Sequence, residues 1–393
     1  MHSEHEAPAV TSVDSLFTQR TVPADTKALL AEFDKVIAST HPLNSKQRAQ
    51  LPQIIRELSH SLTDERDKRH LGYMNRTETL SAYTHYFMWW NLVRLTKLFV
   101  NMSDSFFSLN DGDICLDIGS GPLTVVTALF MARKDLRQKK LTWYCMDISS
   151  QALTVGENIF YSVAAKLGCQ PWNIIRVKGE LGCSIKQKAR LVTSANVFNE
   201  VLQKQTMPPD YLAKKQCQNL MNYTQKSDAR ILVIEPGVPS CARFISLLRD
   251  AFMRKDFVPV SPCTHCEACS MDGKKKGKWC NYVSSTQDAP KALKHLSDTA
   301  HLTKERAVLS FIAVQDKASA QISESEDITF RIASDSIRLP GNRQGYYACS
   351  PLGLLLVVTQ TELASGESYR LALDTNRPLR TDAKSGALIL NLD

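Results

Sequence analysis

The sequence predicts an α/β protein with a doubly wound parallel sheet, a helical N-terminal region and a small all-β C-terminal domain. Within residues 111–316, short runs of branched apolar residues alternate with helical stretches, as in parallel strands joined by helices. These runs cover residues 114–118, 141–146, 173–177, 191–195 and 231–234. After a polar linker at 317–327, residues 328–393 contain strand-like runs separated by turns, which predict a separate β domain of barrel or sandwich type.

Length and composition limit the class of protein. A chain of 393 residues suggests two or three domains, and 43% hydrophobic with 22% charged residues excludes a disordered or fibrous chain. The net charge of +8 favours a polyanionic partner, though only modestly. No apolar run approaches the roughly 18 residues of a membrane span, and no secretory signal precedes the fold, so we expect a cytoplasmic protein of bacterial type.

The N-terminal part divides into a polar segment and a helical one. Residues 1–23 are expected to form a flexible tail. Residues 24–110 carry apolar side chains at helical spacing, which predicts a helical N-terminal region. The aromatic and aliphatic stripe between residues 80 and 100 is more typical of helix–helix core than of a ligand site.

A glycine-rich turn follows the first expected strand. The segment Asp117-Ile118-Gly119-Ser120-Gly121-Pro122 precedes a helical run at 123–132, where glycines let the backbone approach a ligand. A dinucleotide fingerprint requires a further glycine where this chain has Thr124. The Asp-x-Gly-x-Gly pattern instead resembles the S-adenosylmethionine (SAM) pocket of Rossmann-like methyltransferases, with Asp117, Gly119, Gly121 and Pro122 as candidate cofactor-binding residues.

Two later strand ends add candidates to the same pocket. Asp147 and Ile148 end the second strand, 30 residues after Asp117, where an acidic group can accept hydrogen bonds from ribose hydroxyls. The fourth strand is followed by Asn196, Asn199 and Glu200, which we expect on the acceptor side. The alternative is a nucleotide-type pocket that is empty or binds another ligand. No short catalytic motif follows this strand, so the catalytic residues are unknown from the sequence.

Four of the 11 cysteines fall within 18 residues, at Cys263, Cys266, Cys269 and Cys280. Clustered thiols in a reducing compartment more often bind metal than form disulfides. The Cys-x2-Cys-x2-Cys spacing is denser than in a zinc ribbon and is typical of iron–sulfur ligation, with zinc or metal-free thiols as alternatives. We therefore expect a metal-binding insertion at 262–282. Its lysine run at 274–278 could contact phosphates or be a solvated loop.

Several segments together resemble one family, the methyltransferase-like assembly factors of the small ribosomal subunit found in mitochondria and bacteria. The resemblance covers roughly residues 70–393 and rests on segments 116–122, 197–202, 233–239, 262–265, 279–282 and 349–353. It implies a SAM-type class I methyltransferase fold with a 4Fe–4S cluster. Carried over to this sequence, the cluster ligands become Cys263, Cys269, Cys280 and Cys349, whereas local spacing alone would select Cys266 instead of Cys349.

This resemblance implies a SAM-binding methyltransferase-like protein that acts on the small ribosomal subunit, through assembly or rRNA methylation. Its partners would be that subunit and its rRNA, with no membrane. Two alternatives remain open. One is a catalytically inactive factor that binds RNA or the ribosome, and the other is a zinc-containing methyltransferase for a non-RNA substrate. The sequence does not indicate an oligomeric state.

Overall fold

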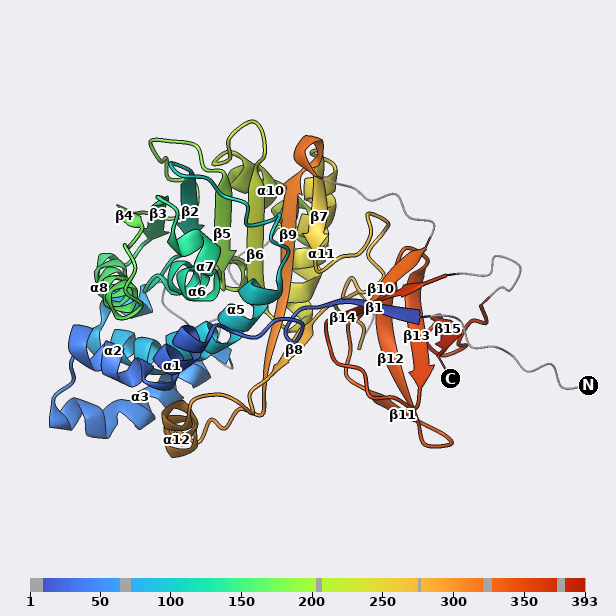
Figure 1. The fold of residues 1–393 in the computed structure, drawn as a ribbon, viewed down its shortest axis with the longest axis horizontal. Helices are drawn as coiled ribbons and strands as arrows, with labels where there is room; N and C mark the ends of the chain where they lie inside the picture. The colour runs from blue at the N-terminus through green and yellow to red at the C-terminus, as the bar shows by residue number, and fades with distance from the viewer. Residues whose placement is uncertain are drawn as a thin grey trace, which may run out of the picture.

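The computed structural model describes residues 10–63, 72–202, 207–274, 277–320, 327–372 and 379–392. Its larger sheet has the strand order β4-β3-β2-β5-β6-β9-β7, with β8 paired to β9 (Figure 1). The strands are β2 (Ile114–Ile118), β3 (Thr142–Asp147), β4 (Asn173–Lys178), β5 (Leu191–Ala195), β6 (Arg230–Pro236), β7 (Phe257–Ser261), β8 (Tyr282–Ser285) and β9 (Arg306–Asp316).

The direction of these strands defines the fold. The pairs β4–β3, β3–β2, β2–β5 and β5–β6 are parallel, and β9 lies antiparallel between β6 and β7. If these seven strands are numbered by their order in the chain, the sheet order is 3-2-1-4-5-7-6, and strand 7, which is β9, runs opposite to the others. This is the class I methyltransferase topology, so the expected fold class is confirmed.

Helices cover both faces of this sheet (Figure 1). One face packs against α5 (Trp89–Asn101), α6 (Thr124–Ala132) and α8 (Ser150–Lys166), and the other against α10 (Pro209–Met221) and α11 (Pro239–Met253). The alternating side chains of a strand supply both cores. In β2, for example, Cys115 belongs to the first cluster while Leu116 and Ile118 belong to the second.

The expected helical N-terminal region packs on the first of these faces. It contains α1 (Ala24–Ala31), α2 (Phe33–Thr40), α3 (Ser45–Thr63), η2 (Tyr73–Asn75) and α4 (Thr77–Ala82), followed by a π-helical stretch, η3 (Tyr83–Met88), that continues into α5. Its aromatic stripe is largely core: Tyr86, Trp89 and Trp90 are buried. The shorter helices α7 (Lys134–Arg137), α9 (Phe198–Val201), α12 (Lys291–Thr299) and η5 (Lys317–Ser319) complete this part.

The C-terminal domain is a second sheet with the order β1-β14-β10-β12-β13-β15, with β11 paired to β12. Its strands are β1 (Val10–Ser15), β10 (Ile328–Ile332), β11 (Ile337–Leu339), β12 (Arg343–Ser350), β13 (Gly353–Thr359), β14 (Glu367–Leu371) and β15 (Leu388–Asn391). It lies beside the β7 edge of the larger sheet (Figure 1).

The flexible tail expected at residues 1–23 needs correction. Residues 1–9 lie outside the described part, but residues 10–15 form β1, which pairs antiparallel with β14. Arg331 fixes this strand, because its guanidinium pairs with Asp14 at 2.6 Å and also donates to the carbonyl oxygens of Gly366 and Pro262. Backbone pairing and one buried cation therefore order a segment whose composition alone suggested disorder.

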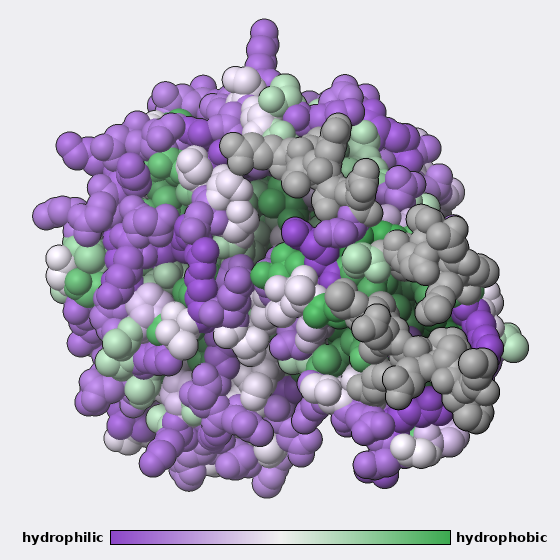
Figure 2. Space-filling view, turned by 45° about the vertical axis from the view of Figure 1, so that its right-hand side comes forward, coloured by the Kyte–Doolittle hydropathy of each residue, from purple (hydrophilic) through white to green (hydrophobic). Residues whose placement is uncertain are grey.

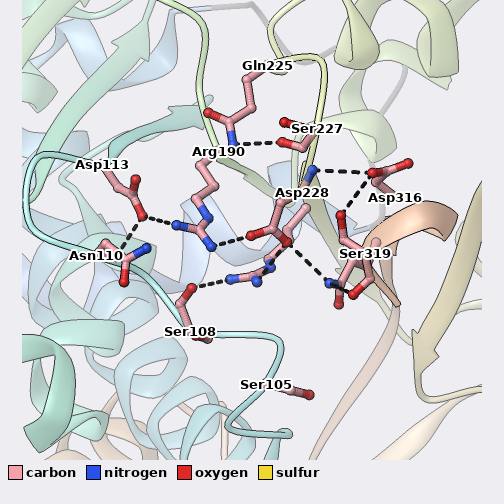
Figure 3. Close-up of polar contacts among 12 residues, drawn as sticks. Ser105, Ser108, Asn110, Asp113, Arg190, Gln225, Ser227, Asp228, Asp316 and Ser319 are labelled. Carbon is pink, nitrogen blue, oxygen red and sulfur yellow. Dashed lines mark hydrogen bonds and ion pairs between the residues drawn. The ribbon is translucent and has the colours of Figure 1, made fainter. Parts of the chain in front are cut away.

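At the amino-terminal edge of the parallel strands, charged side chains form a closed network (Figure 3). Arg190 pairs with Asp113 and Asp228, and Arg230 pairs with Asp228 while donating to the carbonyl oxygen of Ser108. Gln315 adds a further hydrogen bond to Asp228. These interactions tie β2, β5, β6 and β9 together and pair both arginines with carboxylates at this edge.

The molecular surface seen in Figure 2 is mostly hydrophilic, with smaller hydrophobic patches between the polar side chains. In the described ranges, no helix combines the length and the apolar character needed to cross a bilayer.

Candidate functional site

A cavity of about 430 Å³ lies at the carboxyl ends of the parallel strands. In an open α/β sheet, ligands bind at this edge. Six of the predicted cofactor residues line the cavity: Gly119, Gly121, Asp147, Ile148, Asn196 and Glu200. The structure therefore brings the ends of β2, β3 and β5 together around one space, as the strand order requires.

The glycine turn has a backbone that only glycine accommodates easily. Gly119 has φ +65°, and a Cβ atom there would lie 2.1 Å from the Val197 side chain, which also lines the cavity. Gly121 has φ +50° and donates its N–H to the Asp147 carboxylate at 2.8 Å. The turn thus places backbone, rather than side chains, against the cavity.

Asp147 is held by the backbone on both sides. Its second oxygen accepts the N–H of Ser149 at 2.8 Å. Backbone N–H groups therefore hold both oxygens of a carboxylate that lies on the cavity wall. Burial raises the pKa of Asp147 above its usual value, against the effect of these hydrogen bonds.

Three other predicted residues do not line the cavity: Asp117, Pro122 and Asn199. Asp117 is fully buried and accepts hydrogen bonds from Ser120 at 2.6 Å and Thr193 at 2.7 Å. Burial raises its pKa to about 7. In this position the carboxyl braces the turn against β5 instead of reaching the cavity.

Glu235, near the end of β6, is a buried acid that the sequence did not single out. Its carboxylate accepts three backbone N–H groups, from Val197, Phe198 and Asn199, at 2.8–3.1 Å. Burial raises its pKa to about 8 despite these bonds. The acid fixes the segment after β5, in which Asn196 has φ +58° and faces the cavity.

The remaining walls come from segments distant in the sequence. The N-terminal region contributes Tyr73, Met74 and Tyr83, the loop after β4 contributes residues 179–181, and α10 contributes Lys215, Gln216 and Asn219. No sequence signal pointed to these residues, because they do not lie at the ends of the predicted strands that mark the ligand-binding edge of the sheet. The aromatic stripe around Tyr83 was predicted as core, and only its first turn borders the cavity.

The predicted metal ligands come from two separate parts of the fold. Cys263, Cys269 and Cys280 lie between β7 and β8, while Cys349 lies on β12 of the C-terminal domain. Burial raises the pKa of the Cys280 thiol, and the negative charges of the neighbouring cysteines Cys269, Cys263 and Cys349 raise it further. Burial likewise raises the pKa of Cys263 to about 12, with contributions from Cys349 and Cys269. The four thiols are thus mutual neighbours.

Cys266 behaves differently from these four. It is exposed, and it is absent from the groups that shift the pKa of the other thiols. Within the described ranges, no three cysteine, histidine or acidic side chains are arranged to hold a single metal ion. The thiols therefore gather without closing on one central point.

Polar groups surround the four thiols. Arg249 is 2% exposed and donates to the carbonyl oxygens of His265 at 2.9 Å and Glu267 at 2.7 Å, which fixes the loop between Cys263 and Cys269. His265 Nε2 lies 3.1 Å from the sulfur of Cys349, and burial lowers the pKa of this imidazole to about 4. The loop is thereby joined to the C-terminal domain at the thiols.

The lysine run is only partly available to a partner. Lys274 pairs with Asp272 at 3.4 Å, and Lys278 donates to the carbonyl oxygen of Ser385 and lies over the Tyr347 ring. Lys275 and Lys276 lie outside the described residues. The two described ammonium groups therefore stabilise the loop and its contact with the C-terminal domain.

Comparison with known protein families identifies a match that spans most of the chain. The family described as mitochondrial small ribosomal subunit Rsm22 matches residues 90–376, a range that includes the strand-end residues of the cavity and the cysteines but not the cavity wall formed by residues 72–83. Among curated proteins, none shows significant sequence similarity to this chain.

Solved structures with a similar arrangement include several methyltransferases. A precorrin-6y C5,15-methyltransferase from Geobacter metallireducens is 10% identical, with 56% of this chain and 87% of that chain covered and a TM-score of 0.32. A SAM-dependent methyltransferase from Geobacter sulfurreducens, in complex with S-adenosylhomocysteine (SAH), is 12% identical over 57% and 89%, with a TM-score of 0.30. A plantazolicin methyltransferase in complex with SAH is 13% identical over 69% and 98%, with a TM-score of 0.32.

Proposed function

The chain belongs to the Rsm22 family of mitochondrial small ribosomal subunit proteins, and from this premise we propose that it binds SAM and acts on the small ribosomal subunit and its rRNA. The observation that supports this most is the cavity at the carboxyl ends of β2, β3 and β5, with the Asp147 carboxylate on its wall. The family's description names mitochondria, so the cytoplasmic location expected from the sequence stays a prediction.

The charges around the cavity suit SAM, because Asp147, Glu180 and Glu200 line it together with a single described cation, Lys215, while Asp117 and Glu235 lie behind its wall. SAM carries a sulfonium and an ammonium group beside one carboxylate, so its net charge is positive and favours negative surroundings. Among the described residues, the buried carboxyls of Asp117, Asp147 and Glu235 have no lysine or arginine within ion-pairing distance. Burial disfavours their ionised forms, and a bound cation would offset that cost.

The residues on the walls have distinct roles in this proposal. Asp147 accepts hydrogen bonds from the ribose hydroxyls, and the backbone at Gly119 and Gly121 lies along the methionine part. Asn196 and Glu200 face the acceptor. SAM supplies an already activated methyl group, so the protein's contribution is alignment and exclusion of water.

Calorimetry with SAM tests this assignment. Asp147→Asn removes the charge and half of the acceptor capacity, and hydrogen bonds to a charged group contribute about 1.5–3 kcal/mol, so we expect roughly 10- to 100-fold weaker binding. Asp34→Asn, an exposed carboxylate on α2, is the matched control and should bind SAM like the wild type. Equal affinity of the two variants would refute the role of Asp147.

We further propose that Cys263, Cys269, Cys280 and Cys349 hold a 4Fe–4S cluster. In a cubane cluster each cysteine binds a different iron, so the four sulfurs stand farther apart than around one zinc ion. The four thiols are mutual neighbours contributed by the core loop and by β12, so all four are available to one cluster. When bound, a cluster would supply four thiolate–iron bonds that join the core loop to the C-terminal domain.

Metal analysis after anaerobic purification decides between cluster and zinc. We expect about four irons and four sulfides per chain in the wild type, their loss in Cys349→Ser, and their retention in Cys266→Ser. Zinc without iron would support the zinc-containing alternative. Iron lost in Cys266→Ser but retained in Cys349→Ser would favour the ligand set predicted from local spacing.

Methyl transfer needs a separate assay, because a protein can bind SAM and the subunit without catalysis. Immature small subunits incubated with methyl-labelled SAM should yield labelled rRNA if the protein is a methyltransferase. Subunit binding with no label in rRNA would support the catalytically inactive assembly factor. Binding to neither subunits nor rRNA would refute the proposed partner.

A further inference from the structure

A second cavity, of about 410 Å³, lies beside α5 and the start of β9. It is lined by basic, polar and aromatic side chains, including Trp90, Asn91, Arg94, Thr303, Lys304 and Arg306. Strand β9 runs antiparallel to β6, with Leu309 opposite Pro236 at the carboxyl end of β6. Residues 303–308, which line this cavity, directly precede Leu309, so the cavity lies at the same edge of the sheet as the candidate SAM site.

Two cations in this cavity form no ion pair with an acidic side chain in the described part of the chain. Arg94 donates to the carbonyl oxygen of Val308 at 2.8 Å and to the side-chain oxygen of Asn91 at 2.7 Å, while its Nε atom is buried without a hydrogen-bond partner among the described residues. The Lys304 ammonium lies over the rings of Tyr86 and Trp90. The site therefore holds two positive charges that neutral groups position.

Burial makes these charges costly. It lowers the pKa of Lys304 to about 8, with a further contribution from Arg94. It also lowers the pKa of Arg94 to about 10, although the charges of Tyr83 and Glu235 act in the opposite direction. The other charged lining groups do not compensate: Arg306 pairs with Asp335 at 2.7 Å, and Glu305 is exposed. An anion between Arg94 and Lys304 would relieve the desolvation of both.

The two cavities share one helical segment. Tyr83, at the start of η3, borders the candidate SAM cavity, and Trp90 to Arg94 border the basic cavity two turns later, about 10 Å along the helix axis. Insertions of π-helical geometry often mark functional sites. Val308 links the same regions, because it packs against Gly237 directly after β6.

We propose that this basic cavity binds a backbone phosphate of the RNA whose neighbouring nucleotide enters the candidate SAM site. The inference rests on the proposed function, because it names the group by which that RNA is anchored. Arg and Lys are the side chains that bind phosphate oxygens, and the nearby Thr303 hydroxyl and Asn91 amide add hydrogen-bond capacity.

The test measures binding of a fluorescent single-stranded RNA, about ten nucleotides long, over a range of salt concentrations. Lys304→Gln removes one cation, so we expect about 5- to 10-fold weaker binding and a salt slope smaller by about 0.7, the value for one phosphate on a single strand. Lys255→Gln is the control, because this exposed lysine precedes β7 at the opposite edge of the sheet. SAH affinity measured for each variant verifies that the core is folded.

A labelling experiment on the unaltered protein avoids any effect of the substitution on folding. With its lowered pKa, Lys304 should react readily with an amine-specific reagent, and the RNA should protect it. Protection by inorganic phosphate as complete as that by RNA would assign the site to free phosphate and overturn the RNA anchor.

The outcomes separate this inference from the proposed function. RNA binding by the wild type that is equally strong in Lys304→Gln and Lys255→Gln would refute the anchor and leave the proposed function intact. Absence of binding to RNA and to small subunits in the wild type would refute the proposed function, and the anchor with it.

Discussion

Gly119→Ala is the sharpest test of the glycine turn. The new Cβ would lie 2.1 Å from Cγ2 of Val197, and the residue has φ +65°. A left-handed conformation costs an L-residue about 1–2 kcal/mol, and forcing an extra methyl group into a packed site costs about 1–3 kcal/mol. We expect the variant to lose about 2–5 kcal/mol of unfolding free energy.

Two further variants separate these contributions. Gly112 has φ +86°, and nothing lies within 4 Å of the methyl group that alanine would add, so Gly112→Ala should lose only about 1–2 kcal/mol for the backbone. Val197→Ala removes the clashing atom and leaves its own Cβ at 3.4 Å, an ordinary contact. In a double-mutant cycle, Val197→Ala should therefore recover about 1–3 kcal/mol in the Gly119→Ala background.

Urea unfolding of the wild type, the three single variants and the Gly119→Ala/Val197→Ala double variant measures these terms. SAM calorimetry on the same proteins reports the cavity, since Gly119 and Val197 both line it. A coupling free energy below about 0.5 kcal/mol, within the error of additivity, would refute the close approach on which the reasoning depends.

Three other predictions follow from the buried charges and thiols. Burial raises the pKa of Asp117 to about 7 and that of Glu235 to about 8, so both carboxyls ionise between pH 6 and 8 and the affinity for cationic SAM should rise over this range. Calorimetry should show a smaller rise for SAH, which lacks the sulfonium charge. An equal rise for SAM and SAH would contradict the electrostatic role of the two carboxyls. Cys349→Ser should melt at a lower temperature than the metal-loaded wild type, whereas Cys266→Ser should melt at the same temperature as the wild type; equal melting temperatures of the two variants would argue against a clamp between the domains. Arg249→Met should lower the free energy of unfolding in urea by about 3–5 kcal/mol, because two carbonyl oxygens lose a charged donor. Substitution of an exposed arginine, Arg254→Met, should lower it little. Similar losses in the two variants would show that the loop does not depend on Arg249.

The sequence predicted the central strands well because they are buried on both faces. Strands β2, β3, β5 and β6 are mostly buried and read as mainly apolar runs, and their order follows from the fold class. Strand β4 lies at the edge of the sheet and alternates between exposed and more buried residues. Strand β1 has the sequence Val-Thr-Ser-Val-Asp-Ser, is largely exposed and lies at the end of its sheet's strand order, so its composition does not distinguish it from a tail. Strands β7 and β8 flank the cysteines and are only four or five residues long, too short to show a clear alternation.

The site was predictable only where it coincides with strand ends. Gly119, Gly121 and Asp147 lie at strand ends in the larger sheet, and the order of those strands brings them together. Asp117 belongs to the same motif, but its side chain is held by Thr193 on the neighbouring strand, a contact that requires the strand pairing to be known. Arg94 and Lys304 are 210 residues apart, and no local pattern connects them.

The pairing of β1 with β14 has a consequence for the order of events during synthesis. Residues 10–15 leave the ribosome early, but their partner residues 367–371 are made more than 350 residues later. At 5–20 residues per second, the roughly 350 residues between them take on the order of tens of seconds to translate. The Asp14–Arg331 pair, which reaches the carbonyl oxygen of Pro262 beside Cys263, can form only with β10 complete. Cys349 can join the three thiols of the core loop only after the C-terminal domain has been synthesised, so a chain released prematurely would expose both an unpaired strand and an incomplete set of the proposed cluster ligands.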